Sequence, residues 1–217
     1  MKKILIFLIP LMVTLFVGCK GVGIKGNGNV VNEKRAIDKF DEISISGAYN
    51  VDIYVGEEPS VEISGEENLL QYISTEVEHG ELNIYNERSI SPRKRIVIKV
   101  YTPGLNSIST SGASNIYAES IYSERFVMDL SGAGSIKLNG DTQSFEANLS
   151  GAGSLEAKDL IAKYVDINIS GASSADVYAS EKLDASVSGV GGVNYYGNPK
   201  NVDTDISGVG NIRRKSE

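Results

Sequence analysis

The sequence has one cysteine, one histidine and no tryptophan among its 217 residues. A lone cysteine has no partner for an intramolecular disulfide, and a lone histidine cannot supply the several imidazoles of a histidine-rich metal site. That histidine, His79, precedes Gly80, a pairing typical of a solvated turn. The Gly-x-Ser-x-Gly elbow, the phosphate-binding loop and the Cys-x-x-Cys pair are missing as well. These absences predict a protein that is not an enzyme and that uses no cofactor.

Positive charge is also scarce. The chain has 21 lysines and arginines against 28 aspartates and glutamates, for a formal net charge of −7. This acidity predicts no affinity for nucleic acid or for anionic lipid headgroups, since both repel negatively charged surfaces. No arginine occurs between residues 126 and 212, so the carboxylates of this region would repel an acidic sugar. A degenerate pectin-lyase-like carbohydrate-active enzyme is therefore the weakest alternative.

Long apolar runs are confined to the N-terminus. Two lysines precede an apolar run over residues 4–17, and Gly18 and Cys19 follow it. This order predicts a signal peptide over residues 1–18, which is too short for a stable membrane span. Phe16-Val17-Gly18-Cys19 resembles the lipobox of bacterial lipoproteins, with phenylalanine where leucine is usual. The resemblance implies cleavage before Cys19 and acylation of this residue; an ordinary signal peptide with an incidental cysteine is the alternative.

Residues 19–34 are rich in glycine and asparagine and predict a flexible tether behind the acylated cysteine. Several acyl chains hold a protein to a bilayer without help from basic residues. We therefore expect an outer-membrane lipoprotein of the cell envelope that faces either the surface or the periplasm. Its only membrane contact would be the N-terminal lipid.

The motif Ser-Gly followed by Ala or Val occurs seven times. From Ser111 onward it recurs every 18 to 20 residues, a period typical of a solenoid whose short units stack on one another. Apolar residues keep one parity through each motif, as in Phe145, Ala147 and Leu149, which puts the glycines on the inward parity too. Inward glycines predict corners without room for a side chain. The predicted corner glycines are Gly112, Gly132, Gly134, Gly151, Gly153, Gly171, Gly189, Gly191, Gly208 and Gly210.

Each unit provides two short strands and two corners in about 19 residues. This predicts an all-β chain whose residues 106–217 form a narrow parallel β-helix with rungs ~4.8 Å apart; an antiparallel meander is the alternative. Residues 35–105 lack the period and predict an irregular β cap over the first coil. Within the cap we expect a strand over 43–55, a helical turn over 66–72, a hairpin that turns at His79-Gly80, and a strand over 96–100.

Stacking in register would align polar residues into two columns. The first is acidic and the second mixes acids with amides, and like charges one rung apart repel by about 1 kcal/mol in water. Lysines, solvation or asparagine stacking would compensate, whereas bridging Ca²⁺ ions are the sharper hypothesis. The first column consists of Glu146, Asp166, Asp184 and Asp203, and the second of Asp129, Asn148, Asn168, Ser186 and Asp205.

Three tyrosines, Tyr117, Tyr178 and Tyr196, fall on outward positions. Exposed aromatic side chains are common anchors for sugars and protein partners, so these residues are candidate contacts for a glycan or protein ligand. The open end of a coil stack would also invite a homo-oligomer such as a trimer.

Three stretches together resemble the bacterial GIN-domain family, also called domain of unknown function 2807 or the putative auto-transporter adhesin head. They are residues 28–47, with Gly-Asn-Val-Val at the start and Ser-Gly at the end, the block 67–70, and the Ser-Gly-Ala-Gly repeats. The resemblance covers residues 27–213 and implies a right-handed, pectin-lyase-like β-helix with a role in adhesion and no established catalytic residues. A periplasmic structural or signalling accessory is the alternative function.

Overall fold

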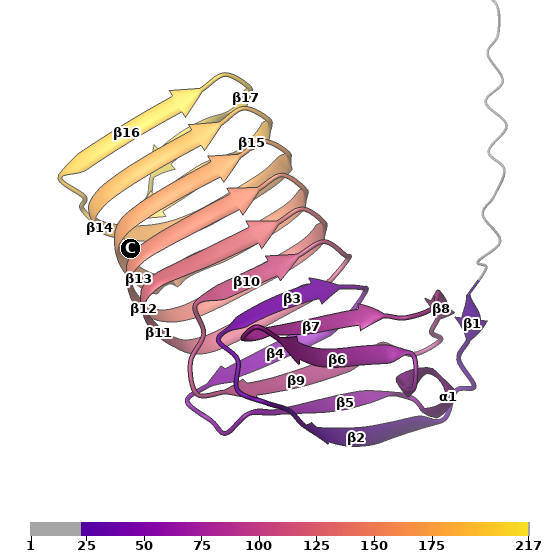
Figure 1. Cartoon of the computed structure of the whole chain (residues 1–217). Helices are drawn as coiled ribbons and strands as arrows, with labels where there is room; N and C mark the ends of the chain where they lie inside the picture. The colour runs from indigo at the N-terminus through magenta and orange to yellow at the C-terminus, as the bar shows by residue number, and fades with distance from the viewer. Residues whose placement is uncertain (1–22, 217) are drawn as a thin grey trace, which may run out of the picture.

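The computed structural model describes residues 23–216, which form a β-solenoid with additional strands at its N-terminal end (Figure 1). The predicted signal peptide, residues 1–18, and the predicted acylation site, Cys19, lie outside the described residues. No helix in the described part of the chain is long and apolar enough to span a membrane. The single turn α1 (Glu67–Leu70) matches the helical turn predicted over 66–72.

Strands that pair in parallel, about 20 residues apart, form the regular part of the solenoid. Every pairing among them is parallel. The predicted parallel β-helix is confirmed, with about 5 turns, and the antiparallel-meander alternative is wrong. These strands are β10 (Ser107–Thr110), β11 (Asn115–Leu130), β12 (Ala133–Leu149), β13 (Ala152–Ile169), β14 (Ala172–Val187), β15 (Val190–Tyr196), β16 (Asn201–Ile206) and β17 (Val209–Arg214).

Each rung has two faces, which meet at a tight Ser-Gly corner on one side and at a looser bend on the other. Strands β11 to β14 run through the loose bend without a break, and the pairing register shifts there, for example between Ala118 and Ile121 and between Ala157 and Ile161. Ser120 has a φ of 61° within the first of these shifts. The loose bend therefore absorbs the variation in repeat length, while the Ser-Gly corners stay aligned.

Alternating apolar residues fill the space between the two faces. Phe126 and Phe145 lie on adjacent rungs with ring centroids 6.1 Å apart, and both are buried. A fully buried side chain of this kind contributes about 1.5–3 kcal/mol. The interior is thus a continuous apolar column, as the period-two pattern in the sequence predicts.

The corner glycines are required by the backbone of the preceding rung. A Cβ at Gly151 would overlap the carbonyl oxygen of Gly132, and a Cβ at Gly132 would overlap that of Gly112. The oxygen of Gly132 accepts a hydrogen bond from the Ala152 N–H at 2.9 Å, which fixes it between the rungs. The parity pattern predicts that these positions point inward; the structure corrects this, since they point along the stack toward the neighbouring rung.

From Ser111 onward, two rungs have serine at the second corner position, Ser114 and Ser173, where the others have glycine. Ser173 is buried, and its hydroxyl donates to the carbonyl oxygen of Gly151 at 3.1 Å. On the rung after Ser173, Gly191 has a φ of +145°, a conformation that favours glycine. At Ser173 a hydrogen bond from the hydroxyl thus takes the place of the close contact between neighbouring backbones that glycine allows on the other rungs.

The N-terminal region contributes rungs of its own. Strands β3 (Glu42–Ser46) and β4 (Asn50–Val55) pair in parallel with β10 and β11 around a Ser46-Gly47 corner. The strand predicted over 43–55 is therefore wrong in its continuity, because the corner divides it. Strands β7 (Glu81–Asn86) and β9 (Val97–Thr102) extend the two faces by one more parallel strand each. The solenoid thus begins inside the region predicted as an irregular cap.

Antiparallel strands then close this end. Strand β6 (Ile73–Glu78) pairs with β7 through the predicted turn at His79-Gly80, where both residues have positive φ. On the other face, β5 (Ser60–Glu66) pairs antiparallel with β9, and β2 (Val30–Ala36) with β5. Between the two edges α1 buries Leu69 and Leu70. The guanidinium of Arg35 on β2 donates to the carbonyl oxygens of Ile73 at 2.6 Å and Leu70 at 3.0 Å, which joins one edge to the other.

The segment predicted as a flexible tether, residues 19–34, is partly ordered. Strand β1 (Ile24–Lys25) pairs with β8 (Ile90–Ser91), and β2 begins at Val30. Buried Glu66 accepts hydrogen bonds from the backbone N–H groups of Gly28 at 2.6 Å and Arg93 at 2.7 Å. The composition of the tether hides these contacts, because a glycine such as Gly26 indicates flexibility, whereas here it leaves room for the Glu66 carboxylate.

Candidate functional site

The predicted acidic column lies in register on the face that leads into the Ser-Gly corners. Its members pair on consecutive rungs, Glu146 with Asp166, Asp166 with Asp184, and Asp184 with Asp203. Basic neighbours offset part of its charge. Arg125 donates to the Glu146 carboxylate, and Lys182 Nζ lies 3.8 Å from Asp184 Oδ2.

Three members of the second column form a chain of side-chain hydrogen bonds. Asn168 donates to Asn148 Oδ1 at 3.4 Å and to Asp166 Oδ1 at 3.1 Å, and Asn148 donates to Asp129 Oδ1 at 3.0 Å. Amide donors therefore satisfy carboxylates in both columns. This is the asparagine stacking that the register predicts, and its amide donors offset part of the carboxylate charge.

Clusters of potential metal ligands are missing from residues 23–216. No group of three or more His, Cys, Asp or Glu side chains comes together there as a metal ion would need. His79 is exposed at the β6–β7 turn, far along the sequence from the two columns.

Tyr117 lies apart from the other two predicted tyrosines. It is half-buried on β11 and pairs with Lys137, on the face that leaves the Ser-Gly corners. Its hydroxyl donates to Glu119 Oε2 at 2.9 Å. That hydrogen bond, followed by burial, raises the pKa of Tyr117. The structure does not bring Tyr117 together with Tyr178 and Tyr196.

Tyr178 and Tyr196 belong to a column at the loose bend, which we call the tyrosine edge. Its five members pair on successive rungs: Tyr122, Asp141, Ile161, Tyr178 and Tyr196. Tyr122 is 83% exposed, Ile161 is 40% exposed, and Tyr178 and Tyr196 are half-buried. Four of the five rungs thus present an aromatic or apolar side chain along one line.

Tyr164, which is 47% exposed on β13, adds a further ring near this edge. Its hydroxyl donates to Glu181 Oε2 at 3.1 Å, and this hydrogen bond raises the pKa of Tyr164. Sequence reasoning missed Tyr122, Ile161 and Tyr164. Alignment on the Ser-Gly motif does not place Tyr122 and Ile161 beside Tyr178 and Tyr196, because register shifts at the loose bend give the two pairs different spacings from the motif.

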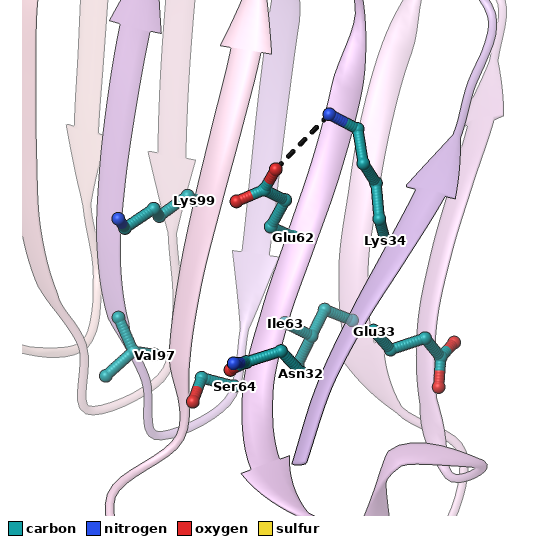
Figure 2. A pocket seen from close by; sticks show the side chains of 8 residues that line it. All are labelled: Asn32, Glu33, Lys34, Glu62, Ile63, Ser64, Val97 and Lys99. Carbon is teal, nitrogen blue, oxygen red and sulfur yellow. Dashed lines mark hydrogen bonds and ion pairs between the residues drawn. The ribbon is translucent and has the colours of Figure 1, made fainter.

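A hollow of about 510 Å³ lies on the outer face of β2, β5 and β9. Figure 2 shows Lys34, Glu62 and Lys99 around it, with the ion pair between Lys34 and Glu62 dashed. Lys34 Nζ lies 3.2 Å from Glu62 Oε1, and these side chains are 67% and 39% exposed. An ion pair this solvated contributes little, so the hollow offers no preorganised charge for a ligand.

Solved structures share this fold. A putative adhesin from Bacteroides fragilis aligns with a TM-score of 0.72 at 24% identity, over 89% of this chain and 100% of that one. A putative lipid binding protein from Parabacteroides distasonis gives 0.53 at 24% identity, over 88% and 99%. A putative adhesin from Parabacteroides merdae gives 0.55 at 18% identity, over 89% and 99%. These likenesses establish the architecture.

Sequence comparison identifies the family. No curated protein shows significant similarity to the chain. The family model described as "putative auto-transporter adhesin, head GIN domain" matches residues 39–199, which include the first Ser-Gly corner and most of the solenoid. The chain therefore belongs to this adhesin-like GIN-domain family.

Proposed function

We propose that the chain is a lipid-anchored, non-enzymatic protein of the cell envelope that acts in adhesion through the tyrosine edge. The observation that carries the proposal is the line of Tyr122, Ile161, Tyr178 and Tyr196, which together with Asp141 occupy five successive rungs. Monomeric proteins rarely leave such side chains in a row on their surface unless a partner covers them. Membership of an adhesin-like family supports the same function.

The position of the N-terminus supports the anchor. Cys19 precedes the first described residue, Gly23, by four positions, so a fully extended chain would span about 14 Å between them. Gly23 lies against Ile90, and β1 pairs with β8 at the closed end of the solenoid (Figure 1). An acylated Cys19 would hold the closed end at the membrane and direct the last coil, β16 and β17, away from it.

The shape of the tyrosine edge favours an extended glycan over a folded protein as the ligand. The edge is one residue wide, and one carboxylate, Asp141, lies between Tyr122 and Ile161, where it can hydrogen-bond to sugar hydroxyls. Rungs ~4.8 Å apart would let a linear chain contact one side chain after another. Aromatic rings with polar tips are suited to such contacts.

The first test locates the protein by protease treatment of intact cells that produce the full chain with a C-terminal epitope. Loss of the epitope, while a periplasmic control protein survives, is the expected result. Survival of the epitope until the outer membrane is permeabilised would contradict adhesion and favour a periplasmic accessory.

The second test measures attachment of these cells to glycan-coated surfaces. Tyr178→Ser with Tyr196→Ser should reduce attachment at least tenfold, because both rings leave the edge. Tyr117→Ser is the matched control, since Tyr117 lies on another face and should leave attachment unchanged. Equal attachment by all three strains would remove the tyrosine edge from the proposal.

A further inference from the structure

The last coil has two strands that are unpaired on their outer side. Among the described residues, β16 pairs only with β14, and β17 pairs only with β15. All six residues of β16 are exposed, and Val209 at the start of β17 is 75% exposed. Val202 and Ile206 have the parity of the interior column and are still 44% and 46% exposed. This end of the stack therefore presents apolar core positions and free backbone hydrogen-bonding groups.

The two strands of this coil carry opposite charges. Asp203 and Asp205 lie on the outward parity of β16, whereas β17 ends in Arg213 and Arg214. All four are exposed, and none of them forms a salt bridge within the described chain. One edge of the coil is thus acidic and the other basic.

This division makes the coil complementary to a second copy of itself. The chain reverses at Ser207-Gly208, so β16 and β17 run in opposite directions. A two-fold axis parallel to the strands would place β16 of each copy antiparallel to β17 of the other, with acid facing base at both contacts. A two-fold axis perpendicular to the faces would instead set β16 against β16, where Asp203 and Asp205 would repel their own copies.

We propose that the last coil is a docking surface for a second copy of this chain, in a two-fold dimer with β16 against β17. Head-to-tail stacking is not available, because antiparallel strands and α1 close the other end. The dimer would cover Val202, Ile206 and Val209 and would extend both sheets across the junction. Its symmetry favours a dimer over the trimer predicted from the sequence.

A dimer of this form places the two closed ends at opposite extremes. If Cys19 carries the anchor, a step that rests on the proposed function, the two lipids face opposite membranes. The protein would then join two cells through its own tips. Six residues in each of two strands make a small interface, so each contact should be weak, in the micromolar range. Many anchored copies would add their strength.

The dimer is tested with charge reversal on residues 20–217 by analytical ultracentrifugation. Asp203→Lys with Asp205→Lys, and separately Arg213→Glu with Arg214→Glu, should each weaken self-association at least tenfold. An equimolar mixture of the two variants should restore it, because each acid again meets a base. Thermal unfolding of both variants checks that they fold like the unmodified chain.

Other outcomes overturn the proposal. An unmodified chain that stays monomeric at several hundred micromolar would show that the charges only prevent association, as charged edges do elsewhere. An Asp203→Lys, Asp205→Lys variant that self-associates as strongly as the unmodified chain would show that β16 does not meet β17, because the new lysines would otherwise face Arg213 and Arg214.

Membrane bridging is measured separately. Cys19 is the only cysteine of the chain, so residues 19–217 can be coupled through it to maleimide lipids in vesicles. Vesicles with the unmodified chain should cluster, those with either charge variant should not, and a mixture of the two variant populations should cluster again. Clustering would support bridging even if the cellular location test failed, whereas a dimer in solution without clustering would contradict bridging alone.

Discussion

The two ends of the solenoid differ in how their outermost strands are covered. At the N-terminal end the strand direction changes, α1 buries Leu69 and Leu70, and Arg35 links the outer strands. At the other end β16 and β17 continue the parallel stack and stop with core positions exposed. A parallel stack has no closure of its own, because every rung is a template for the next. Because only the N-terminal end is closed, the C-terminal end remains able to associate.

The largest effect should come from a corner glycine in the middle of the stack. Gly151→Ala would drive a Cβ into the carbonyl oxygen of Gly132, with rungs on both sides that prevent relaxation. We expect a loss of about 3 kcal/mol in the free energy of unfolding, measured by urea denaturation. Gly208→Ala has the same overlap, with Gly189, but lies in the last coil and should cost only about 1 kcal/mol. Equal losses would contradict the difference between the ends.

The closed end should depend on Glu66. Its carboxylate accepts hydrogen bonds from the N–H groups of Gly28, Arg93 and Lys94. Glu66→Gln removes one acceptor oxygen and should lower the melting temperature by about 5–10 °C. Glu67→Gln is the matched control, since Glu67 has one exposed contact with Asn29 and should change it by less than about 2 °C. Calorimetry that found both variants equal would remove Glu66 as the support of the closed end.

Valine truncation compares an interior rung with the open coil. Val187 is fully buried and Val209 is 75% exposed. Val187→Ala should cost about 2 kcal/mol, whereas Val209→Ala should stay within about 0.5 kcal/mol for the monomer. A large cost at Val209 in dilute protein would mean that the last coil is packed more tightly than the structure has it. Urea denaturation at low protein concentration makes the comparison.

Acid should open the closed end before the middle of the stack. Burial alone would raise the pKa of Glu66, but the N–H donors Arg93, Lys94 and Gly28 outweigh it and hold the pKa below its usual value. The folded state therefore gains stability above the pKa of the unfolded chain, about 4.3, and loses it as the pH falls toward the lower folded value. Melting curves between pH 6 and 3 should fall less steeply for Glu66→Gln. An equal fall in melting temperature for Glu66→Gln and the unmodified chain would contradict this role of Glu66.

The smallest effect should come from calcium. Arg125, Lys182 and Asn168 already contact the carboxylates of the acidic column. We expect melting temperatures in chelator and in millimolar Ca²⁺ to agree within about 1 °C. A rise of several degrees in Ca²⁺, lost in an Asp166→Asn, Asp184→Asn variant, would establish the cation hypothesis instead.

The regular stack could be predicted from the sequence because one constraint recurs at every rung. The need for glycine beneath a backbone carbonyl, as at Gly151, repeats every 18 to 20 residues and survives in the sequence as a period. The first corner, at Gly47, was hidden because the next one comes only at Gly112, after the strands of the cap. The spacing of the Ser-Gly motifs cannot show that two strands pair across so long an insertion.

The candidate site could be predicted only in part. Tyr178 and Tyr196 follow from the outward parity, but their partners Tyr122 and Ile161 lie beyond register shifts at the loose bend. The ordered part of the tether was missed for a related reason. Glycines at 26 and 28 indicate flexibility by composition, whereas here Gly26 leaves room for the Glu66 carboxylate and the Gly28 N–H donates a hydrogen bond to it. Contacts between distant segments decide both features.

Hydrogen exchange at two protein concentrations tests the difference between the ends most directly. In dilute solution, peptides from β16 and β17 and from the N-terminal edge strands β2 and β6 should all exchange faster than β12 and β13. At several hundred micromolar, we expect protection to rise in residues 201–214 and to stay unchanged in residues 30–36 and 73–78. No dependence on concentration at 201–214, or an equal change at the N-terminal edges, would contradict a solenoid that is closed at one end and docks through the other.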